Sequence, residues 1–504
     1  MKGFVYTDYD GVGLAELIKS RQISQMELAE AAISEIEKKN PKLNAVIHKM
    51  YDQARTKAAQ NDCSGEFAGV PVLIKDITQE IKGEPMTSGS KALKGYIAKD
   101  DSAFVKKLRD TGTLFLGQTN VPELALMAIT EPALHGATRN PWNTEYTPGG
   151  SSGGSGAAVA SGMVPIAGAN DGGGSIRIPA AFNGLFGLKP SRGRTPVGKT
   201  LGRQWQGASV DHVLTRSVRD SALMLDLLHG LEKGAAFPSL PFDGSYLEAS
   251  KTPIEKPLRI AYSTVSPIGT EVHPECKNAV IHTAKILESL GYIVEEKEAP
   301  VDGKKIANSY ITMYFGEVAA AIATMEDTLG RKPTFKDVEP TTWLLGLIGQ
   351  STNVGEWVLN MREWDRAAFA MEEFFETYDF YITPTTAYPP SKIGELDPSL
   401  SEKLLMSIIG RLKMGSLLKK TGMIDQLVEN SLKRTPFTQL ANLTGQPAMS
   451  VPLHATPEGM PVGVQFVAAR GEEHRLYQMA GMLEQHHSWL DVKKNPMFHS
   501  LMDI

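Results

Sequence analysis

Residues 147–156 read Thr147-Pro-Gly-Gly-Ser-Ser-Gly-Gly-Ser-Gly156, and residues 170–177 read Asn170-Asp-Gly-Gly-Gly-Ser-Ile-Arg177. Glycine is concentrated around both runs: 13 of the 45 residues from Gly149 to Gly193 are glycine, against 47 of 504 in the whole chain. Glycine costs backbone entropy on folding, so a segment this rich in it needs unusual dihedral angles or a close approach of the backbone. Three chemistries use such a segment.

A phosphate-binding loop is the first of them. Gly193-Arg-Thr-Pro-Val-Gly-Lys-Thr200 matches the pattern G-x-x-x-x-G-K-[ST]. A phosphate loop must follow a strand and begin a helix, because its N–H groups have to converge on the anion. Here Pro190 and Pro196 flank the start, and Gly202 and Gly207 interrupt the segment after it, which has no helical periodicity. We therefore interpret the match as a coincidence of composition.

The nucleophile elbow of α/β-hydrolases is the second, because Gly149-Gly-Ser-Ser-Gly153 fits G-x-S-x-G. An elbow needs an apolar strand directly before it, and Asn143–Pro148 is not such a strand. A triad would also need a later Asp and His, and none of the 11 His residues stands in a telling context. The sequence contains no H-E-x-x-H and no Cys/His cluster with ligand spacing, so we expect no metal site.

Amide hydrolysis without histidine is the third chemistry. A serine after three glycines has successive backbone N–H groups that can point at one spot and hold a developing oxyanion. Its base can be a lysine whose pKa is lowered by burial, since desolvation disfavours the ammonium form. Lys75, at the end of the apolar run Val70-Pro-Val-Leu-Ile74, is the candidate best placed for this role. Ser151 is the candidate bridge if the lysine does not touch the nucleophile.

These residues resemble the amidase signature family. The match comprises Gly149-Gly-Ser-Ser-Gly-Gly154 and Asp171-Gly-Gly-Gly-Ser-Ile-Arg177, in which Ser175 follows Ser151 by 24 positions. Further motifs agree in the same order, at residues 69–76, 119–123, 187–190, 214–220, 381–384, 442–447 and 459–466. The likeness spans about residues 60 to 480, and several ordered motifs are far harder to meet by chance than one.

The resemblance implies an α/β, amidase-signature fold, in which a large twisted mixed β-sheet lies between α-helices. It also implies a Lys–Ser–Ser triad, here Lys75, Ser151 and Ser175, and a cis peptide bond between Gly150 and Ser151. In the mechanism we expect, Ser175 forms an acyl-enzyme, neutral Lys75 is the base and Ser151 relays the proton.

The glycine loop has two further expected roles. The backbone N–H groups that receive the oxyanion are those of Gly172, Gly173, Gly174 and Ser175. Asp171 and Arg177 are expected to support the loop. Asn170 and Gly172 depart slightly from the family pattern on either side of Asp171. This departure should loosen the cluster of oxyanion-binding N–H groups, here called the oxyanion nest, without removing a donor. Glu123 and Arg216 are interpreted as ion-pair or capping residues.

The chain is expected to form a single domain over residues 1–504. Residues 1–60 are predicted to be N-terminal helices, with a capping box at Ser24 and Glu27 and a helix stopped at Asn40-Pro41. Residues 61–300 form the catalytic core, 305–435 a mostly helical insertion, and 436–485 the return to the core. Strands and helices alternate through the core, which is typical of a sheet covered by helices.

The insertion at 305–435 is rich in Met, Leu and aromatic residues, and its stretch Leu404–Leu418 carries many apolar side chains with Arg and Lys around them. Three interpretations are open: a core helix pair with a solvated face, a lid over a substrate pocket, and a surface that binds membranes.

Charge and composition exclude several classes of protein. There are 52 Lys and Arg against 57 Asp and Glu, a net charge of −5, which gives no reason to expect nucleic acid or a membrane as a partner. Two cysteines cannot build a disulfide framework, and no signal peptide or run of about 18 apolar residues is present, so we expect a cytoplasmic protein. No cofactor is expected, and the resemblance allows a homodimer.

The functional prediction is a stand-alone amidase that hydrolyses a small, apolar or cyclic amide. Within the family, the length and the stretch Gly202–Gly207 look most like bacterial amidases related to 6-aminohexanoate-cyclic-dimer hydrolase. Two alternatives stay open. One is the glutaminase subunit of a tRNA-dependent amidotransferase, which shares the triad but needs a polar pocket and partner subunits. The other is a non-catalytic binding protein on the same scaffold.

Overall fold

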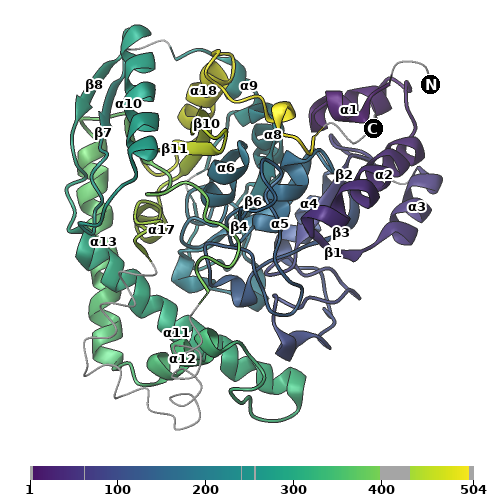
Figure 1. Ribbon diagram of the computed structural model, residues 1–504, viewed down its shortest axis with the longest axis horizontal. Helices are drawn as coiled ribbons and strands as arrows, with labels where there is room; N and C mark the ends of the chain where they lie inside the picture. The colour runs from purple at the N-terminus through teal and green to yellow at the C-terminus, as the bar shows by residue number, and fades with distance from the viewer. Residues whose placement is uncertain (1–3, 62, 240, 255–256, 398–431, 499–504) are drawn as a thin grey trace.

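A single sheet of eleven strands organises the chain (Figure 1). The computed structural model describes residues 4–61, 63–239, 241–254, 257–397 and 432–498. The strand order is β1-β3-β2-β4-β6-β5-β10-β11-β9-β7-β8. The sheet is mixed: β2 runs parallel to β3 and β4, and β7 runs parallel to β8 and β9, while the other pairs are antiparallel. Helices flank the sheet, so the expected α/β architecture is confirmed.

The strands are β1 (Val46–Lys49), β2 (Pro71–Lys75), β3 (Leu114–Thr119), β4 (Ile166–Asp171), β5 (Phe186–Lys189), β6 (Val210–Thr215), β7 (Arg259–Tyr262), β8 (Ile293–Glu296), β9 (Phe380–Pro384), β10 (Ala448–Ala455) and β11 (Pro461–Val467). Every residue of β2, β3, β4, β5, β6, β9 and β11 is buried. Strands that are covered on both faces carry continuous apolar runs, which explains why the core strands lack an alternating pattern.

The helices are α1 (Gly11–Lys19), α2 (Gln25–Leu43), α3 (Tyr51–Gln60), α4 (Ala103–Asp110), α5 (Gly153–Ala160), α6 (Arg177–Asn183), α7 (Gly198–Leu201), α8 (Val218–Leu228), α9 (Tyr246–Lys251), α10 (Pro274–Ser289), α11 (Gly303–Leu329), α12 (Pro340–Gln350), α13 (Val354–Phe375), α17 (Gln439–Thr444) and α18 (Glu473–Glu484). Short 3-10 helices are η1 (Tyr6–Asp8), η2 (Lys91–Leu93), η3 (Glu123–Ala125), η4 (Trp205–Gly207) and η5 (Val492–Lys494). None of the helices in these described ranges is both long and apolar enough to cross a membrane.

The N-terminal region differs from the prediction in two respects. The capping box is confirmed, because Ser24 and Glu27 each bond the other's backbone N–H. The predicted stop at Asn40-Pro41 is wrong, since α2 continues through Pro41 to Leu43. The Asn40 side chain accepts the N–H groups of Ala45 and Val46, the two residues that follow the helix cap, and so holds the last turn of α2. Residues 1–60 are also not all helical, because β1 pairs with β3.

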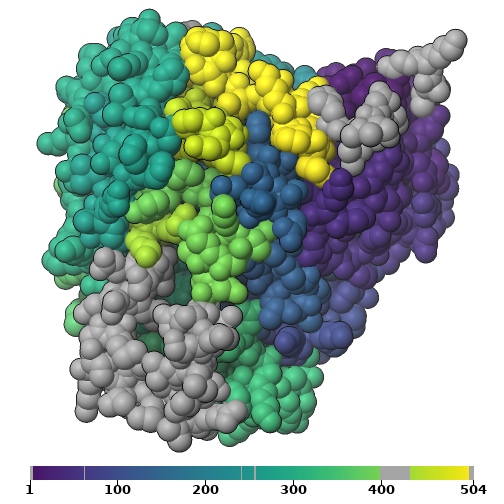
Figure 2. Space-filling model, in the orientation of Figure 1, coloured from purple at the N-terminus to yellow at the C-terminus, as the bar shows by residue number. Residues whose placement is uncertain are grey.

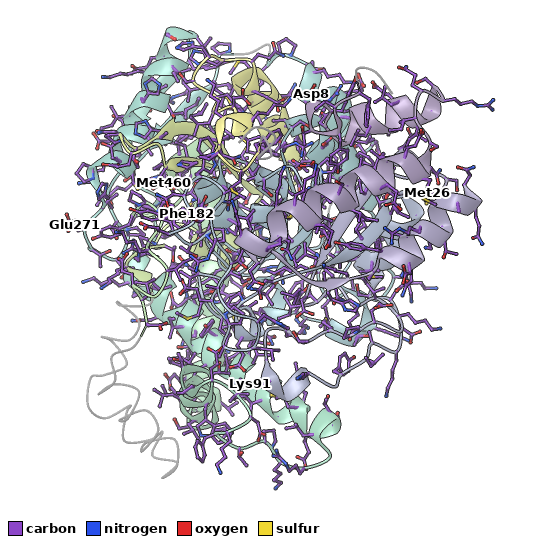
Figure 3. All side chains as sticks on the ribbon, turned by 45° about the vertical axis from the view of Figure 1, so that its right-hand side comes forward. Asp8, Met26, Lys91, Phe182, Glu271 and Met460 are labelled. Carbon is purple, nitrogen blue, oxygen red and sulfur yellow. The ribbon has the colours of Figure 1, made fainter. Side chains whose placement is uncertain are left out.

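Helices α12 and α13 each pack on α11, and the three helices enclose a cluster of buried aromatic and aliphatic side chains. These three helices occupy most of the stretch from Gly303 to Phe375, within the predicted insertion at 305–435. Figure 3 shows Lys91, on η2, beside these helices. The sheet resumes at β9. The stretch Leu404–Leu418, on which the lid interpretation depended, lies outside the described residues.

Distant parts of the chain meet across the top of the molecule. In Figure 2 the N-terminal helices (purple) and the β7–α10–β8 unit (teal) lie on opposite sides, with the C-terminal residues around α18 (yellow) between them. The strand order explains this arrangement, since the C-terminal strands β10 and β11 lie between β5 and β9. Near the other end of this order, β2 and β4 are parallel neighbours, so their carboxyl ends meet at the same edge of the sheet.

Candidate active site

Strand β2 ends on a lysine that is completely buried. Lys75 is the last residue of an all-buried strand that runs parallel to both neighbouring strands, and its side chain is 0% exposed. Its amine donates a hydrogen bond of 2.8 Å to the Ser151 hydroxyl and another to Oδ1 of Asn170. Burial lowers the pKa of Lys75 to about 7, although Asp211 and Asp171 oppose this shift. The amine is therefore neutral in a large share of molecules at neutral pH.

Ser151 lies between the first glycine run and helix α5, and it is completely buried. The peptide bond between Gly150 and Ser151 is cis, as expected. A side chain at position 150 has no room, because a Cβ there would lie 2.6 Å from the carbonyl oxygens of Met127 and Ile129. Glycine at this position therefore lets the backbone come close enough to aim the Ser151 hydroxyl at the lysine.

Ser175 stands on the loop that joins β4 to α6. It is half-buried, whereas Gly174 and Ile176 on either side are buried, and within the described residues no hydrogen bond joins its hydroxyl to Ser151. Gly174 has a φ of +123°, which favours glycine. The carbonyl of Gly173 accepts hydrogen bonds from Thr438 Oγ1 at 2.5 Å and from Gln439 Nε2 at 3.2 Å. Residues more than 260 positions away thus hold the loop.

Asp171 and Arg177 hold the two ends of this loop together. Arg177 donates from Nε and Nη2 to the two carboxylate oxygens, and neither side chain is exposed. Burial raises the pKa of Asp171, but the Arg177 charge and hydrogen bonds from Arg177 and Asn442 outweigh it, so that the pKa lies well below its usual value. The carboxylate is therefore ionised at any pH at which the protein works.

The oxyanion nest differs from the expectation at one residue. The N–H of Gly174 donates to Asp171 Oδ1 at 2.8 Å, so it is committed to the loop rather than free for a substrate. The physical reason is the ionised carboxylate, which accepts the nearest N–H groups at the turn. Gly172, Gly173 and Ser175 are left as the candidate donors of the nest.

Several polar residues around the site were not given roles from the sequence. In the sequence, Asn170 stands out only as a departure from the family pattern, yet its side chain contacts Lys75. Asn442 binds the carbonyl and the carboxylate of Asp171, and Gln465 accepts from Arg177 at 2.6 Å. Both lie in motifs that the family resemblance had already marked, which was the available signal. Asp211 was not singled out by any motif.

An aromatic wall lies against Gly172 and Gly173, the first two of the three glycines. A Cβ at Gly172 would lie 3.0 Å from the Trp205 ring, and one at Gly173 would lie 2.1 Å from the Tyr310 hydroxyl. Trp205 packs edge-on against Tyr314, with ring centroids 5.4 Å apart. The absence of side chains on the glycines thus lets the rings reach the loop.

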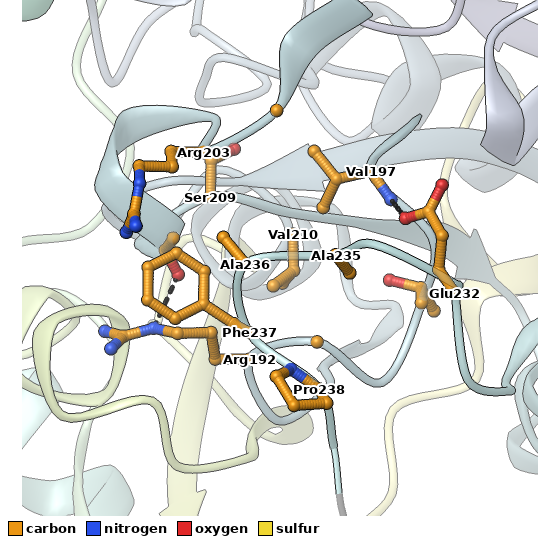
Figure 4. Close-up of a pocket in the computed structure, with 14 residues that line it drawn as sticks. Arg192, Val197, Arg203, Ser209, Val210, Glu232, Ala235, Ala236, Phe237 and Pro238 are labelled. Carbon is orange, nitrogen blue, oxygen red and sulfur yellow. Dashed lines mark hydrogen bonds between the residues drawn. The ribbon is translucent and has the colours of Figure 1, made fainter. Parts of the chain in front are cut away.

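The phosphate-loop pattern forms part of a different hollow, of about 410 Å³ (Figure 4). Its helix α7 has four residues, and the N–H groups of Val197 and Gly198 already donate to the Glu232 carboxylate. The guanidinium groups of Arg192 and Arg203 both lie near the Phe237 ring, each 5.2 Å from its centre. An internal carboxylate therefore holds the N–H groups that a phosphate would need.

Glu123 and Arg216 make structural contacts. Glu123 accepts from the Ser90 hydroxyl and from the N–H of Glu339, at 2.7 Å each, which ties η3 to the start of α12. Arg216 donates to the backbone carbonyls of Tyr9 and Val164. Within the described residues, no group of three or more His, Cys, Asp or Glu side chains is arranged to hold a metal ion.

Comparison with known proteins identifies the family to which the chain belongs. The family model described as Amidase matches residues 27–477. The chain belongs to the amidase family. The resemblance drawn from the ordered motifs is confirmed, and the amidase is a hydrolase of carbon–nitrogen bonds in amides.

Named relatives match the amidase over nearly its whole length. The lipoamidase of Enterococcus faecalis is 36% identical over 483 residues, which are 96% of this chain but only 64% of that protein. The 6-aminohexanoate-cyclic-dimer hydrolase of Pseudomonas sp. (strain NK87) is 37% identical over 489 residues, 95% of each chain. A solved structure of 6-aminohexanoate cyclic dimer hydrolase complexed with substrate is 34% identical, with a TM-score of 0.88, and the match covers 98% of this chain and all of the other.

Proposed function

We propose that this amidase cleaves its substrate through an acyl-enzyme on Ser175, with Lys75 as the base and Ser151 as the proton relay. The observation that carries the proposal is the 2.8 Å hydrogen bond between the buried Lys75 amine and the Ser151 hydroxyl. A lysine acts as a base only when it is neutral, and burial lowers its pKa to about 7. A base of this strength is well matched to work near neutral pH.

The first step transfers two protons along the triad. Ser151 gives its proton to neutral Lys75 and takes the proton of Ser175, and the Ser175 oxygen attacks the amide carbonyl. The negative charge that develops on the carbonyl oxygen is received by N–H groups of Gly172, Gly173 and Ser175. Because the glycine loop is fixed by Asp171 and Arg177, these donors are oriented before the substrate arrives.

The second step expels the amine and then releases the acid. Ser151, which holds a proton from Ser175, gives it to the departing nitrogen so that the amine leaves neutral, and Lys75 returns a proton to Ser151. Water then attacks the acyl group by the same route in reverse. No cofactor enters this scheme, since the proton transfers to and from the substrate and water all pass through the three side chains.

For the substrate we propose a small apolar or cyclic amide. The wall of Trp205, Tyr310 and Tyr314 stands directly against the glycine loop. A solvent-open, partly apolar hollow of about 670 Å³ is lined by Gln439, whose amide binds the Gly173 carbonyl, although the triad residues do not line it. Pockets with mostly apolar walls and few polar groups suit such ligands. The names of two relatives point the same way, a cyclic-dimer hydrolase and a lipoamidase.

A substrate panel read by intact mass tests this function. Anilides, amino-acid amides, cyclic amides and glutamine are each incubated with the enzyme. The reaction is quenched early, and the intact mass of the enzyme is measured. We expect an added acyl mass with an apolar or cyclic amide, on a peptide that contains Ser175. Turnover of glutamine alone would favour a glutaminase, and no acyl mass or product with any compound would favour a binding protein. A cytoplasmic location and a homodimer are sequence-based proposals that fractionation and light scattering test.

A further inference from the structure

Asn170 lies one residue before the end of β4, with its side chain beside the Lys75 amine. The Asn170 residue is 6% exposed, and its Oδ1 accepts a hydrogen bond from Nζ of Lys75. The same Nζ is bonded to the Ser151 hydroxyl. We propose that Asn170 is a positioning residue, which takes one amine hydrogen and thereby turns the lone pair of Lys75 toward Ser151. The inference rests on the function proposed above.

The proposal follows from the bonding capacity of a neutral amine. Such an amine has two hydrogens and one lone pair, and only the lone pair can receive the Ser151 proton. An amine that turns freely about its last carbon–nitrogen bond presents the lone pair to Ser151 for part of the time only. A fixed acceptor on another side removes the unproductive orientations, because it binds a hydrogen and never the lone pair.

The chemical type of the acceptor matters as much as its position. Asparagine has nearly the shape of aspartate, but its amide oxygen carries no full charge. A carboxylate in the same place would form a buried ion pair with the ammonium form and raise the pKa of the lysine. An uncharged acceptor therefore orients the amine without holding it in the protonated state.

The charged groups that face Lys75 are two aspartates on the paired strands β4 and β6. Asp171, at the end of β4, is paired with Arg177. Asp211, which lies opposite Asn170 in the register of β6 on β4, is buried and accepts from Thr78 Oγ1 at 2.7 Å and Gln79 Nε2 at 3.1 Å. Both oppose the lowering of the lysine pKa by burial.

The other elements packed on β2 contribute little charge. Strand β3 and helix α5 contain no titratable side chain. On α2, the buried Lys39 pairs with Glu35 and binds the carbonyls of Ser161 and Phe498. The carboxylate of Asp76, next to Lys75 in the chain, is turned to Thr87. An added charge at position 170 would therefore act directly on the lysine.

The test compares pH profiles of kcat/KM for Asn170→Asp, Asn170→Ala and the wild type. In Asn170→Asp we expect the acid limb to move to higher pH by about 1 to 3 units, the range that an opposite charge nearby produces. At pH 7 a shift of two units lowers the rate about 50-fold, and the rate recovers in alkali. In Asn170→Ala we expect the limb to stay or to move to lower pH, with a plateau about tenfold or more below that of the wild type.

Asn495→Asp is the matched control, since Asn495 is also buried and bonds the carbonyl of Ala160 at the C-terminal end of α5, whereas Ser151 precedes the other end of this helix. It should leave the acid limb in place even if it unfolds more readily. The inference would be overturned if the acid side of the kcat/KM profile stayed at the wild-type pH in both Asn170 variants. It would also be overturned if kcat/KM of Asn170→Ala at high pH equalled that of the wild type. Failure of the proposed function looks different: Lys75→Ala would then keep its activity, whatever the Asn170 variants do. If Asn170→Asp does not fold, the plateau of Asn170→Ala decides alone.

Discussion

Arg177 donates hydrogen bonds to both carboxylate oxygens of Asp171, at 2.9 and 2.8 Å, inside a region where neither side chain is exposed. The carboxylate also accepts the N–H groups of Gly174 and Ile176, one on each side of Ser175. The ion pair thus fixes the backbone around the proposed nucleophile. Its two charges are both removed from water, so each depends on the other.

Removal of one partner of this pair should be costly. We expect Arg177→Met to lower the free energy of unfolding by about 3 to 5 kcal/mol, because a buried carboxylate is left without its counter-charge. Denaturant unfolding followed by circular dichroism measures it. Arg55→Met is the control, since the pair of Arg55 with Glu30 is exposed, and it should change stability little. Equal effects of the two substitutions would contradict the conclusion that the buried Asp171–Arg177 pair stabilises the fold.

The three triad residues should differ in how much activity survives. Ser175→Ala and Lys75→Ala are each expected to lower kcat by about 1000-fold or more, since the nucleophile or the base is lost. Ser151→Ala should leave a larger residual rate, because water can take part of the relay. Steady-state hydrolysis by folded variants measures all three, and normal turnover by Ser175→Ala refutes the assignment of the nucleophile.

The rate should depend on pH through Lys75. Its reactive form is the neutral amine, and burial lowers its pKa to about 7, so kcat/KM rises with pH through this region and levels off above it. Below the pKa of Lys75, each unit by which the pH falls should lower kcat/KM about tenfold. A stopped assay from pH 5 to 9 measures the profile. A rate that stays flat down to pH 5 would exclude a neutral-lysine base.

The same lysine should weaken the fold in acid. A lysine with a lowered pKa binds fewer protons in the folded than in the unfolded state, so its contribution to stability rises with pH from about 7 up to its ordinary value. We therefore expect Lys75→Met to unfold at higher denaturant than the wild type at pH 6, by a margin that shrinks at pH 9. A margin that is constant with pH would show that the buried lysine does not titrate.

Gly173 should not tolerate a side chain. Its Cβ would lie 2.1 Å from the Tyr310 hydroxyl, so Gly173→Ala must push the ring or the loop aside. We expect about a 100-fold loss of kcat/KM, partly restored by a second substitution, Tyr310→Ala, which empties the contact. Gly95→Ala is the control, because nothing lies within 4 Å of its Cβ. No restoration in the double variant would mean that the ring is not what limits position 173.

Local pattern predicted much of this molecule. The apolar run that ends at Lys75 became a buried strand, and the two glycine runs became the turns that carry Ser151 and Ser175. These features depend on short-range rules, because a stretch of about ten residues is enough to indicate a buried strand, a turn or a place where a side chain does not fit. The end of α2 was missed because contacts of the Asn40 side chain outweigh the local effect of Pro41.

The polar support of the site was harder to predict. Asp211 reaches the neighbourhood of Lys75 from β6, and Asn442 reaches Asp171 from α17, across 271 positions of sequence. A single sequence does not say which strands become neighbours, so it does not say which buried acid faces which buried base. The use of the Gly174 N–H by Asp171 belongs to the same class, because it depends on one rotamer of one side chain.

The position of Arg177 has a consequence for how the enzyme is made. Its Nη1 donates to the Thr438 carbonyl at 2.9 Å and to Gln465 at 2.6 Å, partners that lie 261 and 288 positions later in the chain. A ribosome therefore translates most of the message before these contacts exist. Nascent chains and early-terminated products carry Lys75, Ser151 and Ser175 without these contacts to the loop that bears Ser175. Amidase activity should therefore appear only when synthesis of the chain is nearly complete.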